Sequence, residues 1–198
     1  MMGGAAVSVR MVALITVFLP GCNIFEPREA EDPTQSGLNY RPATTPEIVI
    51  QNLQSAIDQK SLANYTLCFS DPLKGNRPLV FIASTEASAQ YPSIMATWTH
   101  AQEEGYFRNL IAKSSPTAYS ALRLELDNSV VGSDSVTYTF RYTLVFEHNE
   151  AGFPATARGT LQFTLGTDQA NIWSIYRWAD YKTGDDISWS MFKGKFSN

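Results

Sequence analysis

One alternating stretch, Val136 to Phe146, limits the fold of this chain more than any other feature. Every second residue is apolar or aromatic, and the residues between them are mostly threonine. Because a strand turns successive side chains to opposite faces of a sheet, this pattern predicts one long strand with an aromatic face and a threonine-rich face. Similar strands flank it and helical patterns precede it, which favours a curved sheet wrapped around helices.

The flanking strands are predicted by the same alternation, over residues 121–131, 157–165 and 172–180, with a short strand at 79–83. Gly132-Ser133-Asp134 is a turn between two of them, so the four longer strands form an antiparallel meander. The last strand carries aromatic residues at both parities, Trp173 against Tyr176 and Trp178. This indicates either a strand covered on both faces or one that contains a β-bulge.

Helical spacing dominates the chain before the strands. A first helix is expected to begin at Thr45-Pro46-Glu47 and to end near Lys60. Threonine can cap the N-terminus of a helix, proline suits the first helical turn, and glutamate suits the positive end of the helix dipole. A shorter helix follows at about 61–69.

A third helix is predicted to begin at Ser93 and carries Trp98 and Phe107, which point about 180° apart at ~100° per residue. Gly105 lies between them. Either the helix kinks or breaks there, or one long helix is buried on two sides.

The C-terminal residues 181–198 carry Trp189, Phe192 and Phe196 on one helical face. We expect this segment to dock over one end of the core; the alternative is a helix that binds a partner.

The N-terminal segment has the pattern of a secretory signal. Residues 1–10 are small and weakly basic, residues 11–19 are apolar, and Pro20-Gly21-Cys22 follow. The apolar run is too short for a bilayer, which needs about 20 residues. Leu19-Pro20-Gly21-Cys22 resembles the lipobox of bacterial lipoproteins, although Pro20 departs from it. That resemblance implies a signal peptide at 1–21, lipid on Cys22, and anchoring to the membrane of the cell envelope, inner or outer.

Residues 22–43 are rich in proline and acidic side chains and have no hydrophobic periodicity, which predicts an extended tether before a single domain at 44–198.

Composition excludes several classes of function. The net charge is −4, and removal of the signal segment leaves 14 basic and 19 acidic residues without a basic cluster, which disfavours nucleic acid. The only histidines, His100 and His148, have no partner at a metal-ligand spacing, and no phosphate-binding loop is present. We therefore expect no cofactor and no metal. Cys68 lies in an apolar run and is expected to be a buried thiol.

The order of three helical segments, a short strand and a four-stranded meander is that of an α+β fold. It resembles the cone-shaped fold of nuclear transport factor 2, ketosteroid isomerase and scytalone dehydratase, and more narrowly a group of bacterial lipoproteins with that fold. The residues that carry the likeness are Pro46-Glu47, Asn52-Leu53, Ala56, Tyr65, Phe69-Ser70-Asp71, Trp98, Phe107-Arg108-Asn109-Leu110, Gly159 to Leu165, Trp173 to Asp180, Ser188-Trp189 and Lys193-Gly194. The resemblance implies a fold and a location in the cell envelope but no activity.

The aromatic face of the central strand suggests a concave apolar site for a small ligand. Its candidate residues are Tyr138, Phe140, Tyr142, Trp178 and Asp180. We expect a non-enzymatic domain that binds such a ligand, or an envelope protein through the outer face of the sheet.

Enzymes of the resembled fold use acids, bases and tyrosines inside the cone. The alternative function is therefore an isomerase or dehydratase, with Asp180 or His100 as base and Tyr142 as hydrogen-bond donor. His100 and Glu103-Glu104, however, lie in a polar run of helix that is expected to face solvent.

The protein partner could also be a second copy. Dimerisation through the open sheet face is frequent in the resembled fold, and here Thr137, Thr139, Arg141 and Thr143 would form a polar interface.

Overall fold

The computed structural model describes residues 40–74 and 76–197. Helices and strands follow in the order α1 (Pro46–Asp58), α2 (Leu62–Leu67), a 3₁₀ turn (Pro72–Lys74), β1 (Val80–Ile82), α3 (Thr85–Gln90), α4 (Pro92–Met95), α5 (His100–Ala112), β2 (Ser120–Val131), β3 (Ser135–Phe146), β4 (Thr156–Thr167), β5 (Trp173–Lys182) and α6 (Trp189–Lys195). This is the predicted α+β order.

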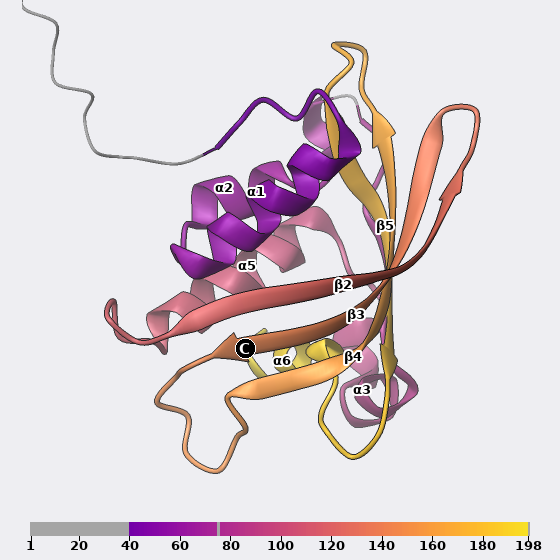
Figure 1. Ribbon diagram of the computed structural model, residues 1–198. Helices are drawn as coiled ribbons and strands as arrows, with labels where there is room; N and C mark the ends of the chain where they lie inside the picture. Colours follow the sequence, from indigo (N-terminus) through magenta and orange to yellow (C-terminus); the bar gives the residue numbers. More distant parts are fainter. Residues whose placement is uncertain (1–39, 75, 198) are drawn as a thin grey trace, which may run out of the picture. The chain divides into compact units, whose positions relative to one another are not determined.

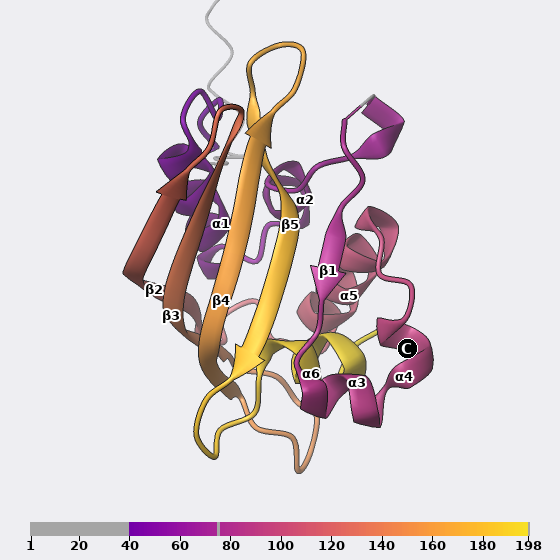
Figure 2. The ribbon, with the colours of Figure 1, turned by 90° about the vertical axis from the view of Figure 1, so that its right-hand side faces the viewer.

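The strands form one sheet in the order β1-β5-β4-β3-β2 (Figure 2). The four long strands pair antiparallel as a meander, and the short β1 lies parallel to β5. The predicted meander and the predicted short strand are therefore confirmed, and the short strand lies at an edge of the sheet.

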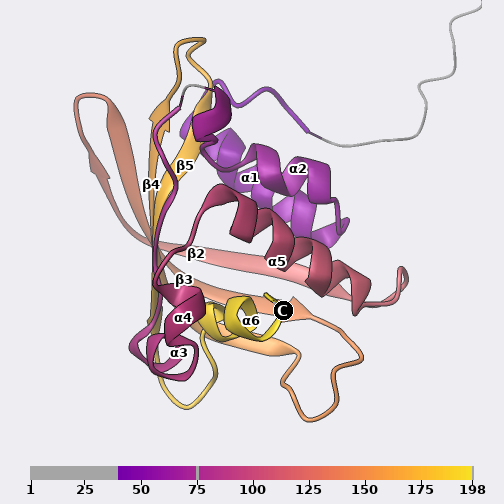
Figure 3. The same cartoon turned by 180° about the vertical axis from the view of Figure 1, so that it is seen from behind.

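The central strand β3 has the two faces that its alternation predicts. From Val136 to Phe146 every second side chain is buried, while Thr137, Thr139, Thr143 and their neighbours on the other face are half-buried or exposed. We call the buried side the inner face of the sheet and the other side the outer face. Helices α1, α2, α5 and α6 all lie on the inner side (Figures 1 and 3).

Helix α1 packs on the sheet through the residues that its spacing indicates. Val49, Leu53, Ala56 and Ile57 are buried. Thr45 is the N-cap residue as predicted, but its side chain makes no capping hydrogen bond, and Pro46 and Glu47 begin the first turn. The Asn52 side chain holds the incoming chain by bonds to both backbone groups of Arg41, at 3.1 Å and 2.7 Å. Ala43 is also buried, so the packed domain already includes the last residues of the segment predicted to be a tether.

The region around Trp98 differs from the prediction. Ser93 does not begin a long helix: α3 and the single turn α4 come first, residues 96–99 break the helix, and α5 begins at His100. Thr99 ends the break with a reciprocal capping box to Gln102. Trp98 lies in this break and does not share a helix with Phe107, so the angle calculated for one continuous helix does not apply, and Gly105 lies inside the unbroken α5.

The last strand and the tail follow the sequence closely. The β4–β5 register shifts between the pairs Thr164–Arg177 and Leu165–Ile175, so Tyr176 is the bulged residue that the mixed parity indicated. Trp189, Phe192 and Phe196 are buried, which confirms that the tail docks on the core.

The proposed signal peptide, Cys22 and the tether up to residue 39 lie outside the described residues. Within residues 40–74 and 76–197, no helix combines the length and the apolar character that a membrane crossing demands.

Candidate functional site

The space between the inner face of the sheet and the helices is filled by α6. Trp189 packs edge-on against Trp178 with ring centroids 4.6 Å apart, and lies 5.8 Å from the ring of Tyr142. Phe192 and Lys193 of the same helix are fully buried. Figure 3 shows α6 on the same side of the sheet as α5. The chain therefore occupies with its own side chains the place where a ligand was expected.

The five predicted ligand-binding residues lie in this core. Tyr142 donates to a carboxylate oxygen of Asp180 at 2.8 Å, and Trp178 packs on Trp189. The rings of Phe140 and Tyr138 lie side by side with their centroids 5.6 Å apart. All five are buried, and only Tyr142 and Asp180 border one of the cavities described below.

Asp180 accepts hydrogen bonds from the first turn of α6. One oxygen accepts the Tyr142 hydroxyl, and the other accepts the backbone N–H of Ser190 at 2.6 Å and its hydroxyl at 2.5 Å. The Tyr142 oxygen in turn accepts the backbone N–H of Trp189 at 2.7 Å. Burial raises the pKa of Asp180, while its hydrogen bonds act in the opposite direction. This pair holds the otherwise unpaired N–H groups of a helix end.

A buried ion pair was not predicted. Glu103 was expected to face solvent, but its side chain is 1% exposed and forms a salt bridge with Lys193, which is 0% exposed. Glu103 also accepts the hydroxyl of Tyr65 at 2.6 Å and the indole N–H of Trp98 at 2.7 Å. The expectation fails because the cation that pairs with Glu103 lies 90 residues further along the chain.

Aromatic rings enclose the ammonium of Lys193. The Nζ atom lies 3.8 Å from the ring centroid of Trp178, and 4.7–5.0 Å from those of Phe81, Trp98 and Tyr106. Burial lowers the pKa of Lys193 to about 8, although Glu103 acts to raise it. A lysine with a lowered pKa is a chemically useful base or nucleophile, but Lys193 lines neither of the two cavities described below.

His100 lies apart from these groups. Its Nε2 atom is 3.3 Å from the carbonyl oxygen of Thr66 on α2, and no hydrogen bond joins it to Asp180 or Tyr142. The structure thus brings together two of the three residues considered for catalysis. No group of three or more histidine, cysteine or acidic side chains suited to a metal ion occurs among the described residues.

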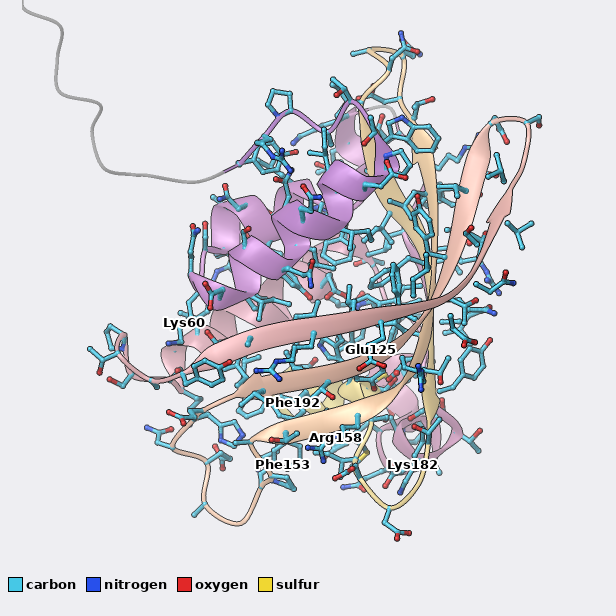
Figure 4. The ribbon with its side chains drawn as sticks, in the orientation of Figure 1. Lys60, Glu125, Phe153, Arg158, Lys182 and Phe192 are labelled. Carbon is cyan, nitrogen blue, oxygen red and sulfur yellow. The ribbon has the colours of Figure 1, made fainter. Side chains whose placement is uncertain are left out.

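A cavity of about 600 Å³ lies on the outer face of the sheet. It is lined by residues of β2, β3 and β4, by the residue before β2 and by the loop after β5. The lining residues are Tyr119, Arg123, Glu125, Arg141, Tyr142, Thr143, Val145, Arg158, Gly159, Thr160 and Thr183. Figure 4 labels Glu125 on β2 and Arg158 on β4. The strand alternation placed Arg123, Arg141 and Arg158 on the polar sides of their strands, but the register that brings the three together could not be read from the sequence.

A second cavity, of about 620 Å³, lies between the β1–α3 connection and the end of β5. Lys182 and Glu86 form an ion pair of 3.1 Å at its border. Lys182 is labelled in Figure 4.

No protein-family model and no curated protein sequence matches this chain. Solved structures do. A protein from Novosphingobium aromaticivorans, provisionally assigned as an aromatic ring hydroxylase, matches with a TM-score of 0.52 at 14% identity, over 77% of this chain and 96% of its own. A conserved protein from Planctomyces limnophilus matches with a TM-score of 0.52 at 8% identity, over 68% and 91%.

A nuclear transport factor 2-like superfamily protein from Salmonella enterica serovar Typhimurium has a TM-score of 0.48 at 12% identity, over 66% of this chain and 83% of its own. At such low identities the comparisons show a shared fold and nothing about activity. Together with the sheet order above, the two similarities with a TM-score of 0.52 confirm the predicted α+β architecture.

Proposed function

We propose that this chain is a lipid-anchored protein of the bacterial cell envelope whose domain binds a partner protein without catalysis, through the outer face of the sheet. One observation carries the proposal: α6 fills the interior. Its side chains Trp189, Phe192 and Lys193 are buried against the inner face. A small apolar ligand in the interior would have to displace them, whereas the cavity on the outer face is open to a partner.

The anchoring part of the proposal rests on residues 1–22 of the sequence. The experiment is metabolic labelling with palmitate and membrane fractionation of the wild type and a Cys22→Ser variant. We expect the wild type to take up label and to sediment with membranes, and the variant to do neither. Membrane partition of the variant, or an unlabelled wild type, would refute the anchor.

The binding part is tested by photo-crosslinking in cells. A photoreactive residue replaces Thr160, which lies in the outer-face cavity, and a matched one replaces Gln51, which is exposed on α1. We expect a discrete cross-linked protein from position 160 and none from position 51. The opposite result would place the interface on the helical side and contradict the proposal.

A second copy of this chain is the other partner for this face. Exchange of Thr139 and Arg141 for residues of different size and charge should change the molecular mass in sedimentation if the sheet forms a dimer. An unchanged mass would exclude the dimer.

The hydrogen bond between Tyr142 and Asp180 favours a second candidate, an isomerase- or dehydratase-type enzyme. A buried aspartate with a raised pKa beside a tyrosine is a possible proton-transfer pair. The assay is turnover of β,γ-unsaturated and β-hydroxy ketones by the wild type and Asp180→Asn. Turnover that Asp180→Asn abolishes while the fold is retained would support the enzyme.

A further inference from the structure

We infer that the outer-face cavity binds an acidic segment of the partner polypeptide, and that Arg123, Arg141 and Arg158 are its carboxylate-binding residues. The inference rests on the proposed function, because it names the chemistry of the partner at that same face. It depends on three observations: the register of the arginines, the charge of the cavity and the way in which each guanidinium is paired.

The register places the arginines on adjacent strands of one face. Arg123 pairs with Thr143 across β2 and β3, and Thr143 pairs with Arg158 across β3 and β4. These three residues form a row across the sheet. Strands are ~4.8 Å apart, so the two arginines at the ends of the row are separated by about 10 Å at their backbones. Arg141 lies in the next row, opposite Glu125 and Thr160.

The cavity has the opposite charge to the protein. Its lining holds three arginines and one glutamate, a formal charge of +2, in a chain whose net charge is −4. All three arginines are exposed. A guanidinium presents two parallel N–H donors that match a carboxylate, so this set of side chains selects an oxyanion ligand over an apolar or cationic one.

The guanidinium groups are available to a ligand. Arg123 forms no salt bridge with any residue of the described part of the chain. Arg141 pairs with Glu125 at 3.2 Å and Arg158 with Asp186 at 3.0 Å, and the side chains of both pairs are about half exposed or more. Exposed ion pairs contribute little to stability, so a carboxylate from a ligand can replace the internal partner at little cost.

A polypeptide segment fits these features better than a small molecule. Sites for small molecules enclose most of the ligand, whereas the arginines of this cavity remain exposed. A proline-rich segment in the polyproline II conformation repeats its side chains every third residue, at a spacing of ~9.3 Å, which is close to that of Arg123 and Arg158. A second copy in a two-fold interface would place this positive patch against itself.

The test is fluorescence anisotropy of the full-length protein in detergent micelles at low salt. The probe is a labelled (Glu-Pro-Pro)₄ peptide, and (Gln-Pro-Pro)₄ is its neutral control. We expect saturable binding of the acidic peptide alone. Because it loses two exposed ion pairs with the peptide, the double variant R123Q/R158Q should bind about tenfold more weakly. The matched variant R108Q/K74Q, which removes two exposed cations elsewhere, should bind like the wild type.

A variant that is expected to strengthen binding makes the test specific. Glu125→Gln removes the carboxylate that competes for Arg141, so it should strengthen binding of the acidic peptide. Equal binding of both peptides, no binding to the wild type, or no effect of R123Q/R158Q would each overturn the inference. In those cases cross-linking from position 160 would still support the proposed function, whereas loss of that cross-link would remove both. Self-association of the wild type in place of peptide binding would identify the occupant as a second copy.

Discussion

Removal of the Lys193 ammonium should destabilise the domain far more than an average substitution. In Lys193→Met a side chain of similar length keeps its contacts with the aromatic rings, but Glu103 loses the cation that pairs with it within the described residues. The two neutral donors that remain, from Tyr65 and Trp98, do not neutralise a buried carboxylate. Removal of one partner from a buried ion pair typically costs ~3–5 kcal/mol.

The reciprocal variant, Glu103→Gln, leaves Lys193 buried without a counter-ion. The lysine can lose its charge by releasing its proton, and the free energy of that deprotonation is the upper limit of the destabilisation. Deprotonation at pH 7 of a group with an ordinary lysine pKa requires about 5 kcal/mol, at ~1.4 kcal/mol per pH unit. The single variants should therefore be destabilised to a similar degree, each by several kcal/mol.

The double variant Glu103→Gln/Lys193→Met carries neither charge. Replacement of a whole buried pair by neutral groups is often close to neutral, so this protein should be more stable than Lys193→Met. The assay is urea unfolding followed by tryptophan fluorescence, with Arg108→Gln as a surface control. A Lys193→Met protein within 1 kcal/mol of the wild type, or a double variant whose loss equals the sum of the single losses, would refute the reasoning. If Lys193→Met does not fold, folding of the double variant still supports it.

Two further outcomes follow from the interior. A Cβ atom on Gly159 would lie 2.9 Å from the Tyr142 ring and would also clash with a backbone carbonyl, so Gly159→Ala should lower the free energy of unfolding by ~1–3 kcal/mol in urea unfolding. Gly105 lies in open space on α5, so Gly105→Ala should raise the free energy of unfolding by ~0.5–1 kcal/mol in the same assay. Cys68 is 1% exposed, and burial raises the pKa of its thiol. In a Cys22→Ser background a thiol reagent should therefore label Cys68 only after denaturation. Rapid labelling of the native protein would contradict this packing.

The sheet could be predicted because its signals are local. The alternation of β3 follows from the pleat of a strand, and the mixed parity of β5 follows from its bulge at Tyr176. The same holds for the first turn of α1, where Thr45, Pro46 and Glu47 act within four residues. None of these features depends on which distant segment packs against them.

The site could not be predicted, because it depends on pairs of residues from distant parts of the chain. Glu103 lies in a run of polar residues, and its burial is explained by its ion pair with Lys193 on α6 and by the hydrogen bonds that Tyr65 and Trp98 donate to it. One signal was available in the tail: Lys193 follows Trp189 by four residues and precedes Phe196 by three, so it shares the apolar face of the helix. A charged residue on such a face requires a buried partner, although the sequence does not identify that partner.

The polar residues of the inner face indicate why an interior ligand is disfavoured. Asp180 and Tyr142, which were considered for catalysis, accept the first backbone N–H groups of α6, and a substrate would have to take their place. Displacement of α6 would expose Trp189, Phe192 and Phe196. At ~1.5–3 kcal/mol for each large apolar side chain, this costs roughly 5–9 kcal/mol. Such a cost would weaken an interior ligand by about a thousandfold or more, since each 1.4 kcal/mol is tenfold in affinity. No such cost applies at the outer face, where the arginines are already exposed to a partner.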